Sequence, residues 1–346
     1  MKKIYNTDGY IDMEYIMAMP ETFIFIVSGR GIGKTYGGLK YAKENNVKFI
    51  YMRRKQKQID IIATDAYNPF KSLNEDLGWN VGLLRVSKDT YGFFDITIDK
   101  DGKKKAASEP LGYTAALSTF ADLRGFDASD IDLLFYDEFI PELHEAKIKH
   151  GATAFFNAVE TINRNRELKG KPPLKCLLAS NSNDLGNELF MELGLVTIAE
   201  NMKKAKQECY VDPERSLRIY ILDVTPIGEK KKKTALYKLT KGTEFANMSI
   251  SNEFIGVEKS RIGSRPLKEY VPIVNAGTIT IYKHKSNNEY YCCQVESKTV
   301  EKYSEGRIDK TRFRKNYSNL LRAYLKNRIV FEQYIDELFF RRMFDI

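Results

Sequence analysis

The stretch FIFIVSGRGIGKTYGGLKYA, residues 23–42, decides the fold of the first half of the chain. It begins with an apolar, β-branched and aromatic run, Phe23–Val27, of the kind that forms a buried parallel strand. Three glycines follow within six residues, and Lys34 then opens a helical segment. A strand, a glycine-rich turn and a helix in this order predict a phosphate-binding loop, because backbone N–H groups and a helix N-terminus can then surround an anion.

The predicted loop departs from the pattern G-x-x-x-x-G-K-[ST] at its first position, where the chain has Ser28. Gly29 can absorb the tight turn one residue later, so we expect phosphate binding to be retained. Lys34 would reach the β- and γ-phosphates of ATP, and the hydroxyl of Thr35 would bind Mg²⁺. The alternative is a glycine-rich turn without a ligand, which the common register of strand, glycines, Lys-Thr and helix disfavours. The residues expected around the nucleotide are Ser28, Gly29, Arg30, Gly31, Ile32, Gly33, Lys34 and Thr35.

The composition indicates a soluble globular protein of about two domains. The 346 residues are 43% hydrophobic and 29% charged, and every apolar run is far shorter than the roughly 18 residues that a membrane span requires. The N-terminal MKKIYNTDGYIDMEY lacks the apolar core of a secretory signal. The four cysteines show no metal-ligand spacing, which favours reduced, buried thiols in an intracellular protein.

Positive charge is concentrated in the C-terminal part of the chain. Residues 1–200 carry a net charge of −2, whereas residues 201–346 carry +11. An excess of this size suggests a polyanionic partner such as a nucleic acid. A solubilising surface is the alternative, and charge by itself leaves the two interpretations equally open.

Residues 20–200 alternate strand-like and helix-like segments, which predicts an α/β domain with a mainly parallel sheet. A helix is expected over residues 152–166, and TIDKDGKKKAASE is expected to form a hairpin or a surface loop. The strands expected in this part are Phe23–Val27, Lys48–Met52, Ile131–Tyr136 and Leu174–Ala179.

After residue 200 the pattern changes. ENMKKAKQECYVDPERS is predicted to be helical and RIYILDV to be a strand, and TPIGEKKKKTALYK, with its four successive lysines, is predicted to be a linker between domains. Residues 269–300 predict three antiparallel strands with KSNNE as a hairpin turn, and the amphipathic tail, residues 311–344, predicts helices.

A second motif, IDLLFYDE, supplies the partner that a phosphate-binding loop requires. Its apolar strand ends in Asp137 and Glu138. Asp137 fits a Walker B aspartate that binds Mg²⁺, and Glu138 fits a base that orients and deprotonates an attacking water. This pair favours ATP hydrolysis over phosphoryl transfer to a small molecule. An exposed acidic pair that merely ends a strand is the alternative.

A third strand, LKCLLASNSND, ends in polar residues, among them Asn181, which we expect to lie beside the nucleotide and sense its γ-phosphate. Ordinary turn chemistry after a strand is the competing explanation.

Hydrolysis also needs positive charge on the transferring phosphoryl group, commonly an arginine from a neighbouring subunit. The candidates are Arg164 and Arg166 at the end of the predicted helix, Arg124, and Arg30 within the loop.

A further basic cluster follows the strand of residues 48–52. It could contact DNA or form a solvated face, and the sequence leaves both open. Its members are Arg53, Arg54, Lys55 and Lys57.

Together, SGRGIGKTY, FIYMRR, FYDEFI, RNRE and SNS, in this order and followed by a basic C-terminal part, resemble the DNA-packaging ATPases of small podophages of the phi-29 type. The resemblance spans nearly the whole chain and includes TEFANMSISNEFIG, residues 243–256. It implies an N-terminal P-loop ATPase domain of the additional-strand catalytic-glutamate class (residues 1–200), a linker or lid subdomain (201–235), and a smaller α+β ribonuclease-H-like domain with a vestigial nuclease site that binds DNA and the portal (236–346).

The resemblance also implies a homopentameric ring in the host cytoplasm, docked transiently on the portal of a prohead and pumping double-stranded DNA with ATP and Mg²⁺. Glu138, Lys34, Arg164 and Arg124 would be its catalytic residues, with Arg164 at the position of the trans-acting arginine finger. Arg124 stands where the family has lysine, which keeps the charge but changes the geometry. Whether a packaging RNA is required stays open.

A ribonuclease-H-like nuclease needs acidic residues on its first strand to hold two metal ions. EYVPIVNAGTITIYK has none between Glu269 and its turn, and Asn275 takes the place of an aspartate, so we expect no DNA cleavage. The rival functions are a nucleotide-gated binding module, which has little need of Glu138, and a helicase or helicase loader, for which motifs beyond the two Walker elements are lacking.

Overall fold

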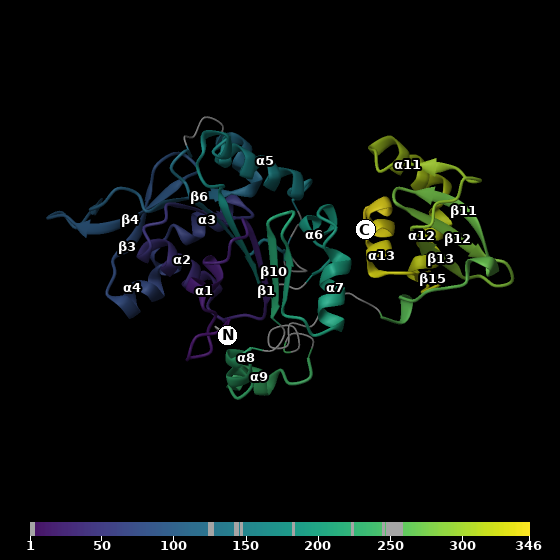
Figure 1. Ribbon diagram of the computed structural model, residues 1–346, viewed down its shortest axis with the longest axis horizontal. Coiled ribbons are helices and arrows are strands. Elements are labelled where there is room, and N and C mark those ends of the chain that lie inside the picture. Colours follow the sequence, from purple (N-terminus) through teal and green to yellow (C-terminus); the bar gives the residue numbers. More distant parts are fainter. Residues whose placement is uncertain are drawn as a thin grey trace. The chain divides into compact units, whose positions relative to one another are not determined.

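The computed structural model describes residues 4–123, 128–141, 145, 148–181, 184–222, 225–243, 246 and 259–346. The chain forms two compact units (Figure 1). Unit 1 comprises residues 1–189 and 202–255, and unit 2 comprises residues 190–201 and 256–346. The division therefore differs from the expected boundaries at residues 200 and 235. No helix in the part of the chain that the structure describes is long and apolar enough to cross a membrane.

Unit 1 is built on one large sheet with the strand order β3-β4-β6-β2-β7-β8-β1-β10-β9. The six strands from β6 to β10 in this order are parallel, and antiparallel strands flank them, which confirms the predicted α/β fold with a mainly parallel sheet. The strands are β1 (Phe23–Ser28), β2 (Phe49–Arg53), β3 (Val81–Arg85), β4 (Tyr91–Ile98), β5 (Lys104–Ala106), β6 (Gly112–Ala116), β7 (Leu133–Asp137), β8 (Lys175–Ser180), β9 (Cys209–Asp212) and β10 (Leu217–Leu222).

The helices in the first part of the chain are α1 (Met13–Met17), α2 (Lys34–Glu44), α3 (Gln56–Ile62), α4 (Lys71–Leu77), α5 (Gly151–Asn163), α6 (Glu188–Glu192), α7 (Val196–Lys204), α8 (Pro226–Lys231) and α9 (Ala235–Leu239). Helices α2 and α5 cover opposite faces of the large sheet. Successive residues of β7 point to opposite faces, and two of them, Phe135 and Tyr136, contact different helices. Phe135 meets α2 so closely that a Cβ on Gly38 would lie 2.7 Å from its ring. Tyr136 instead stacks on Phe155 of α5, with ring centroids 5.7 Å apart.

Three expectations for the middle of the chain can be compared with the structure. The lysine-rich hairpin is confirmed, since β4 and β5 pair antiparallel. ENMKKAKQECYVDPERS is helical only in its first half, because Cys209–Asp212 form β9 and pair with β10. The segment of four lysines is not an extended linker, since it contains α8 and leads into α9, and both helices belong to unit 1.

Unit 2 contains a five-stranded sheet with the order β14-β11-β12-β13-β15. The predicted antiparallel meander is confirmed: β11 (Tyr270–Ala276), β12 (Ile279–His284) and β13 (Tyr290–Cys293) pair in sequence. β14 (Lys302–Tyr303) and β15 (Ile329–Phe331) add in parallel at opposite edges. The tail is helical in α11 (Arg307–Asn316), α12 (Ser318–Leu325) and α13 (Tyr334–Phe344), but the sequence did not reveal the short β15 between them.

Candidate active site

The predicted phosphate-binding loop joins β1 to α2 as expected. Gly31 and Gly33 have φ of 76° and 89°, a left-handed conformation that L side chains rarely adopt. Gly33 is the N-cap of α2, so the loop leads directly into the N-terminus of an 11-residue helix. Ile32 is buried, and its carbonyl accepts a hydrogen bond of 2.9 Å from the backbone N–H of Ile11, which anchors the N-terminal segment to the loop.

Lys34 is buried at the start of α2 and points back into the loop. Its Nζ donates to the Ser28 hydroxyl at 2.7 Å and to the carbonyl of Gly29 at 3.0 Å. Burial lowers the pKa of Lys34 to about 7, with Asp137 and Glu138 opposing the shift and the nearby Lys231 and Arg30 adding to it. Ser28, the departure from the glycine pattern, therefore supplies an acceptor that holds the loop lysine in place.

Thr35 and Asp137 meet across the sheet edge. The Thr35 hydroxyl donates to Asp137 Oδ2 at 2.8 Å, and the Tyr51 hydroxyl donates to the same oxygen at 2.7 Å. Burial and the adjacent Asp137 raise the pKa of Tyr51, so its hydroxyl stays protonated and donates. A hydroxyl oxygen and a carboxylate oxygen side by side are the hard ligands that Mg²⁺ prefers, so this pair fits the metal that the sequence predicts.

Glu138 follows directly after β7, in a left-handed conformation with φ of 54°. Its two carboxylate oxygens are held from different elements. Asn181, just after β8, donates to Oε1 at 3.4 Å, and the guanidinium of Arg53 pairs with Oε2. Asn181 thus lies at the predicted edge, but its contact is with the carboxylate of Glu138.

Arg53 is the residue whose place the sequence did not settle. β2 pairs with β7 in parallel up to Met52 and Tyr136, so the next residues, Arg53 and Asp137, lie side by side. Arg53 Nη1 is 3.4 Å from Asp137 Oδ2, and the side chain of Arg53 is only 14% exposed. It therefore joins both Walker B carboxylates and is no solvated basic residue. The only available signal was the position of Arg53 at the end of a strand next to the Walker B strand.

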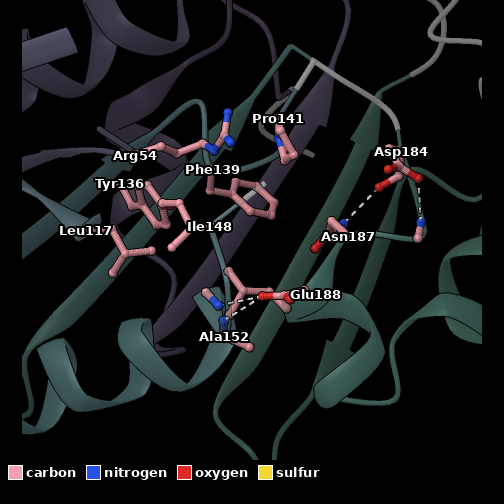
Figure 2. Close-up of a pocket in the computed structure, with 13 residues that line it drawn as sticks. Arg54, Leu117, Tyr136, Phe139, Pro141, Ile148, Ala152, Asp184, Asn187 and Glu188 are labelled. Atoms are coloured by element: carbon pink, nitrogen blue, oxygen red, sulfur yellow. Dashed lines mark hydrogen bonds between the residues drawn. The ribbon is translucent and has the colours of Figure 1, made fainter. Parts of the chain in front are cut away.

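The neighbouring Arg54 points to the other face of the sheet, where it pairs with Glu145 at 2.5 Å. There it lines a small cavity of about 60 Å³ together with Tyr136 and Phe139 (Figure 2). In Figure 2, Glu188 points at the first residues of α5, and its carboxylate accepts from the backbone N–H of Gly151 at 2.5 Å. A cavity of this size holds only a few water-sized groups, so it is not a nucleotide site.

A much larger cavity, of about 600 Å³, adjoins the phosphate-binding loop. Gly31 and Gly33 line it together with Tyr10, Tyr36 and Lys40. The Tyr10 ring packs against Gly33, since a Cβ there would lie 3.4 Å from the ring. The volume of this cavity suits a nucleoside. The N-terminal segment forms one wall of the cavity, a role that the sequence does not predict.

The candidate arginines are placed very differently. Arg166 is buried and donates to the carbonyls of Ile131 and Pro172 and to Asp132, so it fastens the start of β7 and is unsuited to reach a neighbouring subunit. Arg164 is exposed and caps the C-terminus of α5 with φ of 37°. Because α5 runs back along the sheet for about 20 Å, Arg164 lies at the end opposite to Glu138. Arg124 lies outside the described residues.

The chain is similar to a known protein family, to two phage proteins and to a solved structure. The family model described as Podovirus DNA encapsidation protein (Gp16) matches residues 4–304. The chain is 24% identical over 237 residues to the DNA packaging protein of Bacillus phage phi29, which covers 67% of this chain but only 62% of the phage protein. It is also 24% identical over 327 residues to the DNA packaging protein of Bacillus phage B103, covering 89% and 92% of the two chains. The fold is similar to the solved structure of the Phi-28 gp11 DNA packaging motor, with a TM-score of 0.65 and 18% identity over 99% of each chain.

Proposed function

The chain belongs to the podovirus DNA encapsidation protein (Gp16) family, and from this premise we propose that it is an ATPase that drives double-stranded DNA into a phage prohead. The observation that carries the proposal is the convergence of Lys34, Thr35, Asp137 and Glu138 at one edge of the large sheet. A nucleotide-gated binding module would need Lys34, Thr35 and Asp137 to hold the nucleotide. The carboxylate of Glu138 beside them is suited to repeated ATP hydrolysis.

The glycine loop and Lys34 would bind the triphosphate of ATP, and Lys34 would exchange the Ser28 hydroxyl for a phosphate oxygen. Thr35 and Asp137 would hold Mg²⁺, which neutralises charge on the β- and γ-phosphates when bound. Glu138 would accept a proton from the attacking water. Arg53 and Asn181 would orient the Glu138 carboxylate for this step, since each contacts one of its oxygens.

A neighbouring subunit would complete the site, because the chain would assemble into a homopentameric ring. Arg164 lies about the length of α5 away from its own Glu138, so it would act on the nucleotide of a neighbouring subunit. Arg124 is the second candidate for this role. The ring would dock on the portal of a prohead in the host cytoplasm, with the need for a packaging RNA left open.

The basic excess of residues 201–346 would bind the DNA backbone without sequence preference. DNA would not be cut, because β11 carries no carboxylate. The side chain of Asn275 is already bonded within unit 2: it accepts from the Thr280 hydroxyl of β12 at 2.6 Å and donates to the carbonyl of Ser297, between β13 and β14, at 2.7 Å.

The test is ATP hydrolysis by the full chain alone, with DNA, and with DNA and proheads. We expect turnover that rises with both additions. Lys34→Ala should lose nucleotide binding, whereas Glu138→Gln should bind ATP and Mg²⁺ but hydrolyse roughly 10²–10⁴ times more slowly, because the water loses its base. Normal turnover in Glu138→Gln would contradict the assignment. Tight ATP binding without turnover in the unmodified chain would favour the binding module, and unwinding of duplex DNA would favour a helicase.

A further inference from the structure

A second lysine reaches the phosphate-binding loop from far along the chain. Lys231, the last residue of α8, donates from Nζ to the carbonyl of Arg30 at 2.7 Å. An ideal Cβ on Gly31 would lie 2.1 Å from this nitrogen. The ammonium group therefore occupies the space that Gly31 leaves by having no side chain, at the middle of the loop.

Helix α8 holds Lys231 there through several independent contacts. Its N-cap, Thr225, is buried and accepts from the backbone N–H of Gly228 at 3.0 Å. Pro226 packs against Gly9, where an added Cβ would lie 2.7 Å away. Lys230 donates to the carbonyl of Asp8 at 2.9 Å. A helix that is anchored to the N-terminal segment presents Lys231 to the loop at a defined position.

The surroundings of Lys231 are cationic. Among the residues that the structure describes, no carboxylate forms an ion pair with it, and burial together with Arg30 lowers its pKa. Lys34 is the other lysine at the loop, and Lys231 and Arg30 are among the groups that lower its pKa as well. Gly31, on which Lys231 sits, also lines the cavity of about 600 Å³. Lys231 and Arg30 bring positive charge to the loop, and a polyanion bound there would stabilise both groups.

We infer that Lys231 is a second phosphate-contacting lysine of the nucleotide site, which exchanges the carbonyl of Arg30 for an oxygen of a bound nucleoside triphosphate. The inference rests on the proposed function and deepens it. It gives the lysine-rich helix α8 a place over the bound nucleotide, so that the triphosphate would join the loop to the segment that follows β10. Lys34 would still supply the contact inside the loop.

The test compares three variants of the full chain. Lys231→Gln keeps a donor for the carbonyl of Arg30 but loses the charge, and Lys231→Arg keeps the charge. Lys232→Gln is the matched control, because Lys232 is the next residue of the chain and pairs with the exposed Glu229 at 2.6 Å. Affinities for ATP and for adenosine are measured by titration, and thermal melting checks that each variant is folded.

We expect Lys231→Gln to weaken ATP binding about ten- to a hundredfold and to leave adenosine binding unchanged, because only the charged contact to phosphate is lost. Lys231→Arg should recover most of the affinity, and Lys232→Gln should bind like the unmodified chain. The inference is overturned if folded Lys231→Gln binds ATP normally, or if it loses ATP and adenosine affinity equally, since Lys231 would then only support the loop. Absence of ATP binding by the unmodified chain would instead overturn the proposed function itself.

Discussion

The ends of two central strands, β7 in unit 1 and β11 in unit 2, use a buried polar residue in opposite ways. Asp137 at the end of β7 gathers Thr35, Tyr51 and Arg53, so hydroxyls and a cation from two other elements surround one carboxylate. Asn275 near the end of β11 bonds with Thr280 of the adjacent strand and with Ser297. A charge that draws hydroxyls and a cation from several elements marks a site for chemistry, whereas an amide that bonds a neighbouring strand and the loop beside it stabilises the local fold.

The largest effect should come from removing the arginine that completes the site of unit 1 from a neighbouring subunit. Arg164→Ala should bind ATP but hydrolyse it roughly 10³–10⁵ times more slowly, because charge on the transferring phosphoryl group loses its stabilisation. Glu138→Gln should also be nearly inactive, because the attacking water loses its base. Mixing the two variants should restore part of the ATPase activity, since some interfaces of a mixed ring pair an intact Glu138 with an intact Arg164.

The control for this mixture is evidence from crosslinking that mixed rings form. If they form and activity stays absent, Arg164 acts within its own subunit or only supports the end of α5. Arg124 would then be the next residue to exchange.

Arg166→Ala distinguishes the two arginines of RNRE. We expect this exchange to lower thermal stability, because the bonds of Arg166 to Ile131 and Pro172 fasten the start of β7.

A reciprocal exchange tests the comparison directly. Asp137→Asn should reduce turnover at least about a hundredfold with a small change in stability, because it removes a metal ligand from an edge made of hydroxyls and a cation. Asn275→Asp should leave the ATPase rate unchanged and destabilise unit 2 by roughly 3 kcal/mol at pH 7, because it buries a charge among neutral partners. The measurements are steady-state ATPase rates and hydrogen exchange of β11 and β12. Metal-dependent DNA cleavage by Asn275→Asp would contradict the view that this position is structural.

The sequence predicted the parts of the active site that are local. A strand, glycines and Lys34 follow one another within a dozen residues, and Asp137 and Glu138 end a strand, so both motifs carry their own structural context. It could not assign Arg53, because its partners are fixed by the pairing of β2 with β7, which are 80 residues apart in the chain. The same applies to Asn181, whose position at the strand edge was predicted but whose bond to Glu138 was not.

The lysine-rich segment shows why composition misled the prediction of a linker. Four successive lysines and a preceding Pro-Ile-Gly suggest a solvated connection. In the structure Thr225, Ile227 and Gly228 are buried. Two of the four lysines, Lys230 and Lys231, donate to backbone carbonyls of the N-terminal segment and of the loop. Lysine can bury its aliphatic stem while its ammonium finds acceptors, so a run of lysines does not by itself exclude a packed helix.

A smaller effect is expected for Arg53, which joins the two Walker B carboxylates. Arg53→Ala should lower kcat about ten- to a hundredfold with a smaller change in KM for ATP, because Glu138 loses the group that orients it while the phosphate-binding loop is untouched. Arg53→Lys should restore only part of kcat, since it cannot pair with both carboxylates in a fork. The matched control is Lys57→Ala, an exposed change in the same basic cluster, which should leave DNA-independent ATPase activity unchanged. An equal loss in Lys57→Ala would point to a general charge effect.

The smallest effect concerns unit 2 and its stability alone. Burial raises the pKa of the Asp336 carboxyl from 3.8 to about 6, although Gln294 and the backbone N–H of Gln333 donate to it and oppose the shift. Folding therefore favours the protonated carboxyl, and this stabilisation is complete below about pH 4 and is lost as the pH rises through 6. Between pH 5 and 7.5 the stability of unit 2 should fall by about 1 kcal/mol from this group. Hydrogen exchange in α13, corrected for intrinsic rates, measures it. Asp336→Asn should abolish the pH dependence, and Glu296→Gln, an exposed exchange, should keep it. A pH dependence that survives in Asp336→Asn would mean that another group of unit 2 titrates.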